Sequence, residues 1–153
     1  MGDQRDLESR IRVLEDIEAI KRLQHKYWRC MSTRQWDEVA DCFIENGELD
    51  MGPDRKFTGI DEIRAFFRSL GPRMRLNVPQ GHSPEIEITG ETAATGIWMV
   101  DVCNVPTTSN ASRAAALYRD NYTKVNGEWK IKNKTSTFLY TQAVQLLEVK
   151  DLT

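Results

Sequence analysis

The sequence predicts an α+β fold in which N-terminal helices pack on a strongly curved, mostly antiparallel sheet. Apolar residues recur at three- and four-residue spacing in the first part of the chain, whereas apolar and polar residues alternate in most segments from Met74 onward. Helical segments that precede a run of strands, instead of alternating with them, are typical of this class. Because a curved sheet that wraps a long helix encloses a space, we expect a cone-shaped hollow.

Three helices and two short strands are expected before the main sheet. A long amphipathic helix over residues 7–31 is followed by a break at residues 32–34 and a second, short helix that begins near Trp36. A third helix covers about residues 60–70 and ends at Gly71-Pro72. The short strands, residues 48–51 and 56–58, flank a Gly-Pro-Asp turn. The apolar stripe of the long helix consists of Leu7, Ile11, Leu14, Ile17, Ile20, Leu23 and Tyr27.

The rest of the chain predicts an antiparallel meander. Asn126-Gly127, between two alternating segments, is the strongest short hairpin signal in the sequence. Residues 106–112 are small and polar and form a connection between strands. The expected strands cover residues 74–78 leading into 82–89, then 92–105, 113–125 and 128–140.

Length and charge restrict the class of protein. A chain of 153 residues fits a single domain over residues 1–153, with a core of about residues 7–142. Its 21 basic and 23 acidic residues are scattered, so nucleic acid is not an expected partner. No apolar run approaches the ~20 residues that span a bilayer, and the N-terminus lacks the pattern of a secretory signal. We therefore expect a cytoplasmic protein with no membrane contact, whose three cysteines are buried thiols.

A histidine and a carboxylate in neighbouring strands are the main functional signal. His82 opens one strand, and Asp101 interrupts an otherwise apolar run in the next. Residues two apart share a face of a strand, so Asp101 lies with Met99 and Cys103, and we expect both it and His82 to face inward. An imidazole oriented by a carboxylate inside a pocket is the arrangement of a general base. The alternatives are a histidine satisfied by backbone groups and an aspartate in a structural ion pair.

Tyr27 is the third candidate, because it lies on the apolar stripe of the long helix and its hydroxyl needs a polar partner if buried. Packing alone is the alternative interpretation of this residue. His25 lies on another helical face and is expected to be solvated. Two histidines far apart in sequence make a metal site unlikely to form, and no phosphate-binding glycine loop or nucleophile elbow occurs.

Several segments together resemble a known family: Ile17–Leu23, Lys26–Cys30, Trp36-Asp37, Gly81–Ile86, Thr92–Trp98 and Tyr122–Ile131. The chain is similar to the SnoaL-like branch of the nuclear-transport-factor-two-like superfamily over roughly residues 7–140, most of all to the bile acid seven-alpha-dehydratases and more distantly to the scytalone dehydratases. This resemblance implies a cone-shaped barrel with a deep hydrophobic cavity, a homo-oligomer (dimer or trimer), and neither a metal nor an organic cofactor.

The resemblance also implies functional residues. The dehydratase's tyrosine, histidine and strand aspartate correspond to Tyr27, His82 and Asp101, whereas its second aspartate corresponds to Ser32. We therefore expect a cofactor-independent lyase, a dehydratase acting on a hydrophobic cyclic substrate such as a steroid or polyketide. His82 would act as base, Asp101 would orient it, Tyr27 would donate a hydrogen bond, and Ser32 would position substrate or water.

Met99 and Cys103 are expected to line the substrate pocket beside Asp101. Isomerisation or cyclisation of a similar substrate is an alternative to dehydration. A protein that binds a small apolar molecule without converting it is a second alternative, because a fold by itself does not assign a function.

Overall fold

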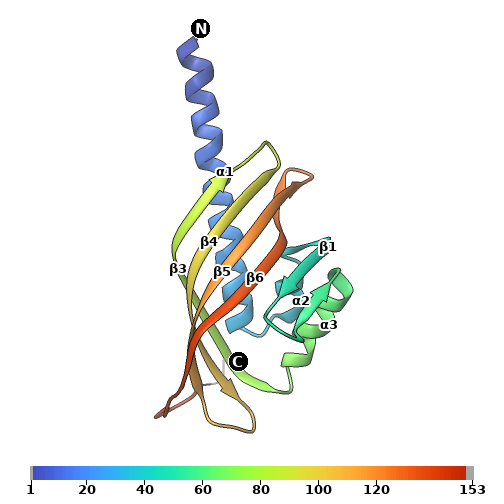
Figure 1. The fold of residues 1–153 in the computed structure, drawn as a ribbon, viewed down its shortest axis with the longest axis vertical. Helices are drawn as coiled ribbons and strands as arrows, with labels where there is room; N and C mark the ends of the chain where they lie inside the picture. Colours follow the sequence, from blue (N-terminus) through green and yellow to red (C-terminus); the bar gives the residue numbers. More distant parts are fainter. Residues whose placement is uncertain (1, 151–153) are drawn as a thin grey trace.

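The computed structural model describes residues 2–150, and it has the predicted order of helices followed by a long meander (Figure 1). The helices are α1 (Gly2–Ser32), α2 (Trp36–Ala40) and α3 (Ile60–Leu70). The strands are β1 (Phe43–Asp50), β2 (Lys56–Thr58), β3 (Met74–Ile88), β4 (Ala93–Pro106), β5 (Ser112–Val125) and β6 (Glu128–Ala143).

The six strands form one sheet in the order β2-β1-β6-β5-β4-β3. Each neighbouring pair is antiparallel except β1 and β6, which run parallel, so the first strand of the chain lies beside the last. The sheet curls around the C-terminal half of α1, and α3 lies beside β1 (Figure 1). The predicted α+β class with helices on a curved sheet is confirmed.

Two short signals in the sequence correspond to the turns that they predict. Asn126 and Gly127 both have positive φ, 51° and 81°, as a two-residue hairpin turn between right-twisted strands requires. Gly52 and Asp54 also have positive φ, and they close the turn between β1 and β2. The third helix has the predicted bounds and buries one face through Ile63, Phe66, Phe67 and Leu70.

Only part of α1 is packed on the sheet. Its C-terminal half places Ile20, Tyr27 and Trp28 in the core, whereas Leu7 and Leu14 on the same predicted stripe are exposed. Figure 1 shows the reason, since the N-terminal turns of α1 extend beyond the end of the sheet. The helix is predicted correctly, but the periodicity does not reveal where its contact with the sheet begins.

Strand β3 is a single strand where the sequence predicts two segments. Pro79 lies in its middle and has no N–H to donate, which suggests a break when only the sequence is considered. In the structure β3 is an edge strand, where the missing donor faces away from the sheet and proline is tolerated. The strand is irregular between His82 and Glu85, where Ser83 has a φ of 50°.

No helix within residues 2–150 is both long enough and apolar enough to cross a membrane. Cys30 and Cys42 are buried free thiols, as predicted, while Cys103 is half-buried. Burial raises the pKa of the Cys42 thiol to about 11, so this thiol stays protonated and unreactive at neutral pH.

Candidate functional site

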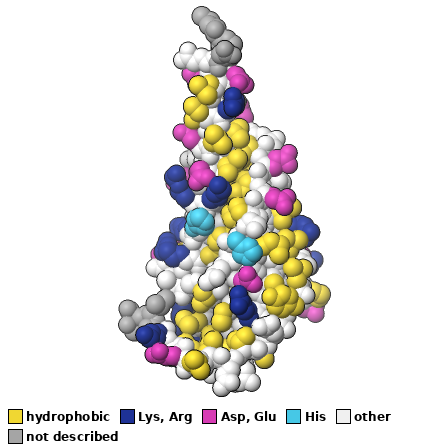
Figure 2. Space-filling model, turned by 90° about the vertical axis from the view of Figure 1, so that its left-hand side faces the viewer, with side chains coloured by type: hydrophobic (Ala, Val, Ile, Leu, Met, Phe, Trp, Pro, Cys, Tyr) yellow, Lys and Arg dark blue, Asp and Glu magenta, His cyan; other side chains and the backbone are white. Residues whose placement is uncertain are grey.

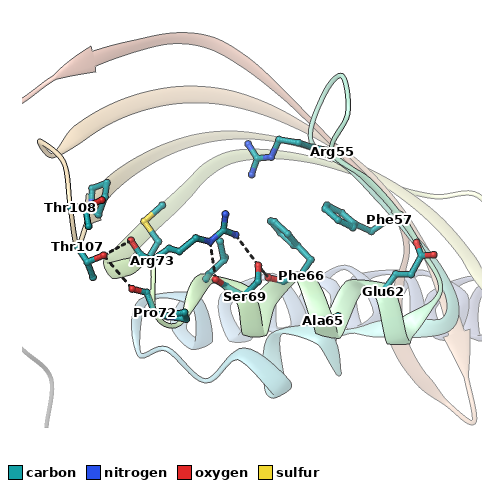
Figure 3. Close-up of a pocket in the computed structure, with 13 residues that line it drawn as sticks. Arg55, Phe57, Glu62, Ala65, Phe66, Ser69, Pro72, Arg73, Thr107 and Thr108 are labelled. Carbon is teal, nitrogen blue, oxygen red and sulfur yellow. Dashed lines mark hydrogen bonds between the residues drawn. The ribbon is translucent and has the colours of Figure 1, made fainter.

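Two adjoining cavities lie at the wide end of the cone. The outer one has a volume of about 1010 Å³ and lies between α3, the β1–β2 turn and the turn that follows β4 (Figure 3). The inner one, about 120 Å³, is more enclosed and reaches α1 and the inward faces of β3, β4 and β5. The two cavities adjoin each other, because four residues line both: Arg55, Phe66, Leu70 and Met74.

The inner chamber is mostly apolar and has a few polar groups. Tyr27 lines it from α1 and Tyr118 from β5, while Asn77 and Asn104 line it from paired positions of β3 and β4. Asn77 donates a hydrogen bond to Asn104 at 2.6 Å, but the Asn77 side-chain oxygen has no partner among residues 2–150 although the residue is only 9% exposed. Buried polar atoms normally have partners, so this oxygen is available to a hydrogen-bond donor in the chamber.

Tyr27 lies inside the cone, as predicted. Its ring is packed edge-on against Phe43 and Phe67, and its hydroxyl forms no hydrogen bond with any residue that the structure describes. Burial raises the pKa of Tyr27 well above its ordinary value, and the nearby Tyr118 and Asp120 raise it further. The hydroxyl therefore remains protonated at neutral pH and can donate a hydrogen bond, but it is a poor base.

The outer cavity combines an aromatic wall with two arginines (Figure 3). Phe57 of β2 and Phe66 of α3 are stacked, with their ring centroids 4.4 Å apart and their planes 22° from parallel. Arg55 lies over the Phe66 ring at 5.8 Å, and Arg73 donates hydrogen bonds to the Ser69 carbonyl and hydroxyl oxygens at 2.9 and 2.8 Å. Such a surface suits a flat apolar molecule that also has a polar group.

The predicted pair of His82 and Asp101 exists. The Nε2 atom of His82 lies 3.1 Å from Oδ2 of Asp101, within hydrogen-bond distance, and the Ser83 hydroxyl lies 3.4 Å from the other ring nitrogen. The side chains are 52% and 31% exposed, respectively. The pairing inferred from sequence is therefore present, but in a solvent-exposed setting.

The prediction that this pair faces into the cone is wrong. At Gly81, the residue before His82, an added Cβ would lie 1.9 Å from the Trp28 ring, so position 81 faces α1 and position 82 faces away from it. Neither His82 nor Asp101 lines either cavity described above. Figure 2 accordingly shows both histidines of the chain at the surface, including His25, which is exposed as predicted.

The alternation in β4 is ambiguous, which explains the error. Both faces of this strand are rich in apolar residues, so the sequence does not show which of them is covered by helix. In the structure Trp98 is buried with its ring 5.0 Å from that of Trp28, which places the even-numbered residues of this region inside. Met99 and Cys103 therefore lie on the outer face with Asp101, and they do not line the cavities described here.

Ser32, the remaining predicted site residue, is half-buried at the end of α1. Its hydroxyl donates a hydrogen bond of 3.0 Å to the Trp28 carbonyl within the same helix. It lines neither cavity of the cone. Of the six predicted site residues, the structure thus brings only Tyr27 to the chamber, and it joins His82 to Asp101 elsewhere.

A buried polar network lies behind the chamber, and sequence reasoning did not find it. Lys134 of β6 and Asp120 of β5 form an ion pair of 2.6 Å with both side chains fully buried. The ammonium group also lies 4.7 Å from the centroids of the Tyr27 and Tyr118 rings. Burial lowers the pKa of Lys134, while the adjacent Asp120 opposes this shift. Tyr122 donates a hydrogen bond of 2.9 Å to the same carboxylate. The network therefore holds the rings of Tyr27 and Tyr118 beside Lys134.

Neither cavity offers a recognisable metal site. Within residues 2–150, no group of three or more His, Cys, Asp or Glu side chains is arranged to hold a metal ion. Among the residues that the structure describes, Glu62 is the only carboxylate that lines the two cavities, and it accepts a hydrogen bond of 2.8 Å from the Thr58 backbone N–H. The polar groups that line the two cavities are thus amides, the hydroxyls of tyrosine, serine and threonine, and guanidinium groups.

Comparison with known proteins agrees with this architecture. The family model of the SnoaL-like domain matches residues 12–135, which is most of the chain. The chain belongs to the SnoaL-like domain family. Several solved structures have the same fold as this SnoaL-like domain, at identities that establish the fold alone.

Three of these structures illustrate the likeness. A candidate scytalone dehydratase from Novosphingobium aromaticivorans has a TM-score of 0.81 and 22% identity, over 91% of this chain and 94% of that one. A type 2 hexachlorocyclohexane dehydrochlorinase, LinA, has a TM-score of 0.82 and 17% identity, over 92% and 96%. A candidate aromatic ring hydroxylase from N. aromaticivorans has a TM-score of 0.79 and 22% identity, over 86% and 94%.

The residues that line the SnoaL-like cone were mostly missed from sequence. Asn77 and Asn104 are polar residues within strands and gave a usable signal, because buried amides that face each other across a pair of strands form hydrogen bonds. Arg55 and Arg73 gave none, since exposed arginines near turns are common. Only the curvature of the sheet brings them to one cavity.

Proposed function

We propose that this SnoaL-like domain binds a small, largely apolar molecule inside its cone. The observation that carries the proposal is the pair of adjoining cavities, which share four lining residues. Ligand sites are typically concave, apolar and provided with a few polar groups that fix orientation. The inner chamber, about 120 Å³, is comparable with a ~150 Å³ cavity that admits a benzene ring.

The free polar atoms of the inner chamber specify the end of the ligand that enters it. Tyr27 offers a hydroxyl donor, and Asn77 offers an acceptor that lacks a partner among the described residues. A hydroxyl group on a ring satisfies both, because it accepts from the tyrosine and donates to the amide oxygen. A ligand with only a carbonyl at this end would leave the Asn77 oxygen unpaired, and an unpaired buried polar atom costs about 1–3 kcal/mol.

A matched pair of substitutions tests binding in the cone. Met74 lines both cavities, so Met74→Trp fills space in them, whereas Met99→Trp adds the same bulk on the outer face of the sheet. The probe is N-phenyl-1-naphthylamine, a neutral molecule that joins a naphthalene and a phenyl ring through one N–H donor, and its fluorescence reports binding. We expect the wild type and Met99→Trp to bind it alike and Met74→Trp to bind at least about tenfold more weakly.

Circular dichroism would establish that both variants are folded. Equal affinity of the two variants would show that the probe binds elsewhere, and an absence of saturable binding to the wild type would refute the proposal.

The hydrogen bond between His82 and Asp101 favours a second candidate function, a cofactor-independent lyase or isomerase. Two of the structural neighbours are described as a dehydratase and a dehydrochlorinase, and both reactions are eliminations. In this proposal His82 removes a proton, Asp101 holds the imidazole tautomer, and the substrate lies on the outer face of the sheet. Tyr27 takes no part in this reaction, because it lies inside the cone.

Loss of water from a cyclic β-hydroxy ketone, followed by the absorbance of the conjugated enone, tests this activity. Turnover that is abolished in His82→Gln, with unchanged probe binding in the cone, would support the lyase. Turnover that is equal in wild type and His82→Gln would exclude His82 as the base. The homo-oligomer and the cytoplasmic location stay predictions.

A further inference from the structure

The two arginines of the outer cavity point into the same space. Arg55 extends from the β1–β2 turn on one side of the cavity, and Arg73 extends from the segment between α3 and β3 on the other (Figure 3). Their guanidinium groups both lie over the stretch of cavity beside Phe66 (Figure 3). Hydrogen bonds to Ser69 fix the side chain of Arg73, and the Phe66 ring supports Arg55.

Neither arginine is paired with a carboxylate among the described residues. Arg73 donates hydrogen bonds to neutral oxygens of Ser69, and Arg55 contacts the Met51 sulfur and the Phe66 ring. Glu62 lines the same cavity, but its carboxylate is held by the Thr58 backbone. Two like charges that face one space repel each other, and an anion placed between them removes this repulsion.

Other arginines nearby are neutralised. Arg68 and Arg64 of α3 form ion pairs of 2.6 and 2.8 Å with Asp37 and Asp41, on the side of the helix that faces α2. The same helix thus has paired arginines on one side and the cavity with its unpaired arginines on the other. On α3, therefore, the arginines that face α2 are neutralised, whereas the two that line the cavity are not.

We propose that Arg55 and Arg73 form an anion subsite, so that the ligand of the cone is a small apolar acid. This inference rests on the proposed binding function and names the class of molecule. The acid group, a carboxylate or a sulfonate, lies between the two guanidinium groups, each of which can donate two parallel hydrogen bonds to such an anion. The apolar body stacks along Phe57 and Phe66 and extends toward the inner chamber.

A pair of probes that differ only in the acid group tests the subsite. 8-Anilinonaphthalene-1-sulfonate is N-phenyl-1-naphthylamine with one added sulfonate, so a comparison of the two isolates the contribution of the anion. The variants are Arg55→Gln, Arg73→Gln and their combination, with Arg119→Gln on the exposed face of β5 as the matched control. Because both cavity arginines are exposed, the expected effects are moderate.

We expect the wild type to bind the sulfonate more tightly than the neutral probe. Each single variant should weaken sulfonate binding about threefold and the double variant about tenfold, while the neutral probe and Arg119→Gln remain within twofold of wild type. Raising the salt concentration from about 0.05 to 0.5 M should weaken only the sulfonate, since mobile ions screen the charges.

The outcomes separate this inference from the function on which it rests. If the neutral probe binds and the double variant leaves sulfonate affinity unchanged, the anion subsite is refuted and the apolar chamber stands. If neither probe binds the wild type in a saturable manner, binding in the cone itself fails. If the double variant binds both probes more weakly by the same factor, the arginines maintain the shape of the cavity, and their charge-specific role is refuted.

Discussion

Gly81→Ala tests the assignment of faces in β3, on which the location of the site depends. The added methyl carbon would lie 1.9 and 2.0 Å from two carbons of the Trp28 ring, whereas carbon atoms in contact are about 3.5–4.0 Å apart. The indole would have to move by about 1.5 Å or more. It cannot do so freely, because Trp28 is only 5% exposed and is packed on edge against Trp98.

The expected loss of stability follows from these contacts. Overfilling a packed core costs about 1–3 kcal/mol, and replacing glycine by alanine returns about 0.5 kcal/mol through the unfolded chain, so we expect a net loss of about 2 kcal/mol. In a chain of 153 residues this corresponds to a fall of about 6 °C in Tm. The free energy of unfolding is measured by urea titration with circular dichroism.

Two further variants complete the experiment. His82→Ala removes a side chain that is half exposed and should change the free energy of unfolding by less than about 0.5 kcal/mol. Trp28→Leu removes the obstacle, so Gly81→Ala should cost at least about 1 kcal/mol less in that background. A large loss for His82→Ala combined with no loss for Gly81→Ala would show that the histidine faces the core and would refute the reasoning.

The core network and its tyrosines supply the remaining predictions. Lys134→Met leaves Asp120 buried without its cation and should reduce the free energy of unfolding by about 3–5 kcal/mol. Lys134→Met combined with Asp120→Leu should restore most of this loss. A loss below about 1 kcal/mol for Lys134→Met in urea titration would contradict a buried ion pair. Burial raises the pKa of Tyr27, and it raises that of Tyr118 to about 12, so the folded chain keeps protons that the unfolded chain releases near pH 10. The free energy of unfolding should therefore fall above pH 10.5, by about 1.4 kcal/mol per pH unit for each of these two tyrosines. The contribution of Tyr118 should end near pH 12, and Tyr118→Phe should make the fall less steep. Burial lowers the pKa of Lys134, so this residue makes stability rise with pH, but only below its ordinary pKa of 10.5. Unfolding curves measured at a series of alkaline pH values check whether stability falls above pH 10.5.

The elements of the fold were predictable because their signals are local. The third helix, the Asn126-Gly127 turn and the long strands each depend on spacing or backbone preference within a few residues. Two strands differ from the prediction. β1 begins at Phe43, five residues before the predicted strand of residues 48–51. β3 contains Pro79, and only its place at the edge of the sheet makes that residue compatible with an unbroken strand.

The candidate site was predictable only in part. Tyr27 lies on a helical stripe with one apolar side, so its inward position could be inferred from the sequence. The contact between His82 and Asp101 could also be inferred, because neighbouring antiparallel strands bring their side chains together. The cavity lining could not, since Arg55, Asn77 and Tyr118 come from distant segments.

The sequence by itself determined the order of elements, the class of fold and the partnership of one histidine with one aspartate. Tertiary structure alone decided which face of the sheet the helices cover, and hence that this pair lies outside while amides, tyrosines and arginines line the cone. The physical reason is the period of two in a strand. Alternation divides residues into two sets, but when both sets are apolar only long-range packing, here of Trp28 against Gly81 and Trp98, selects the inner one.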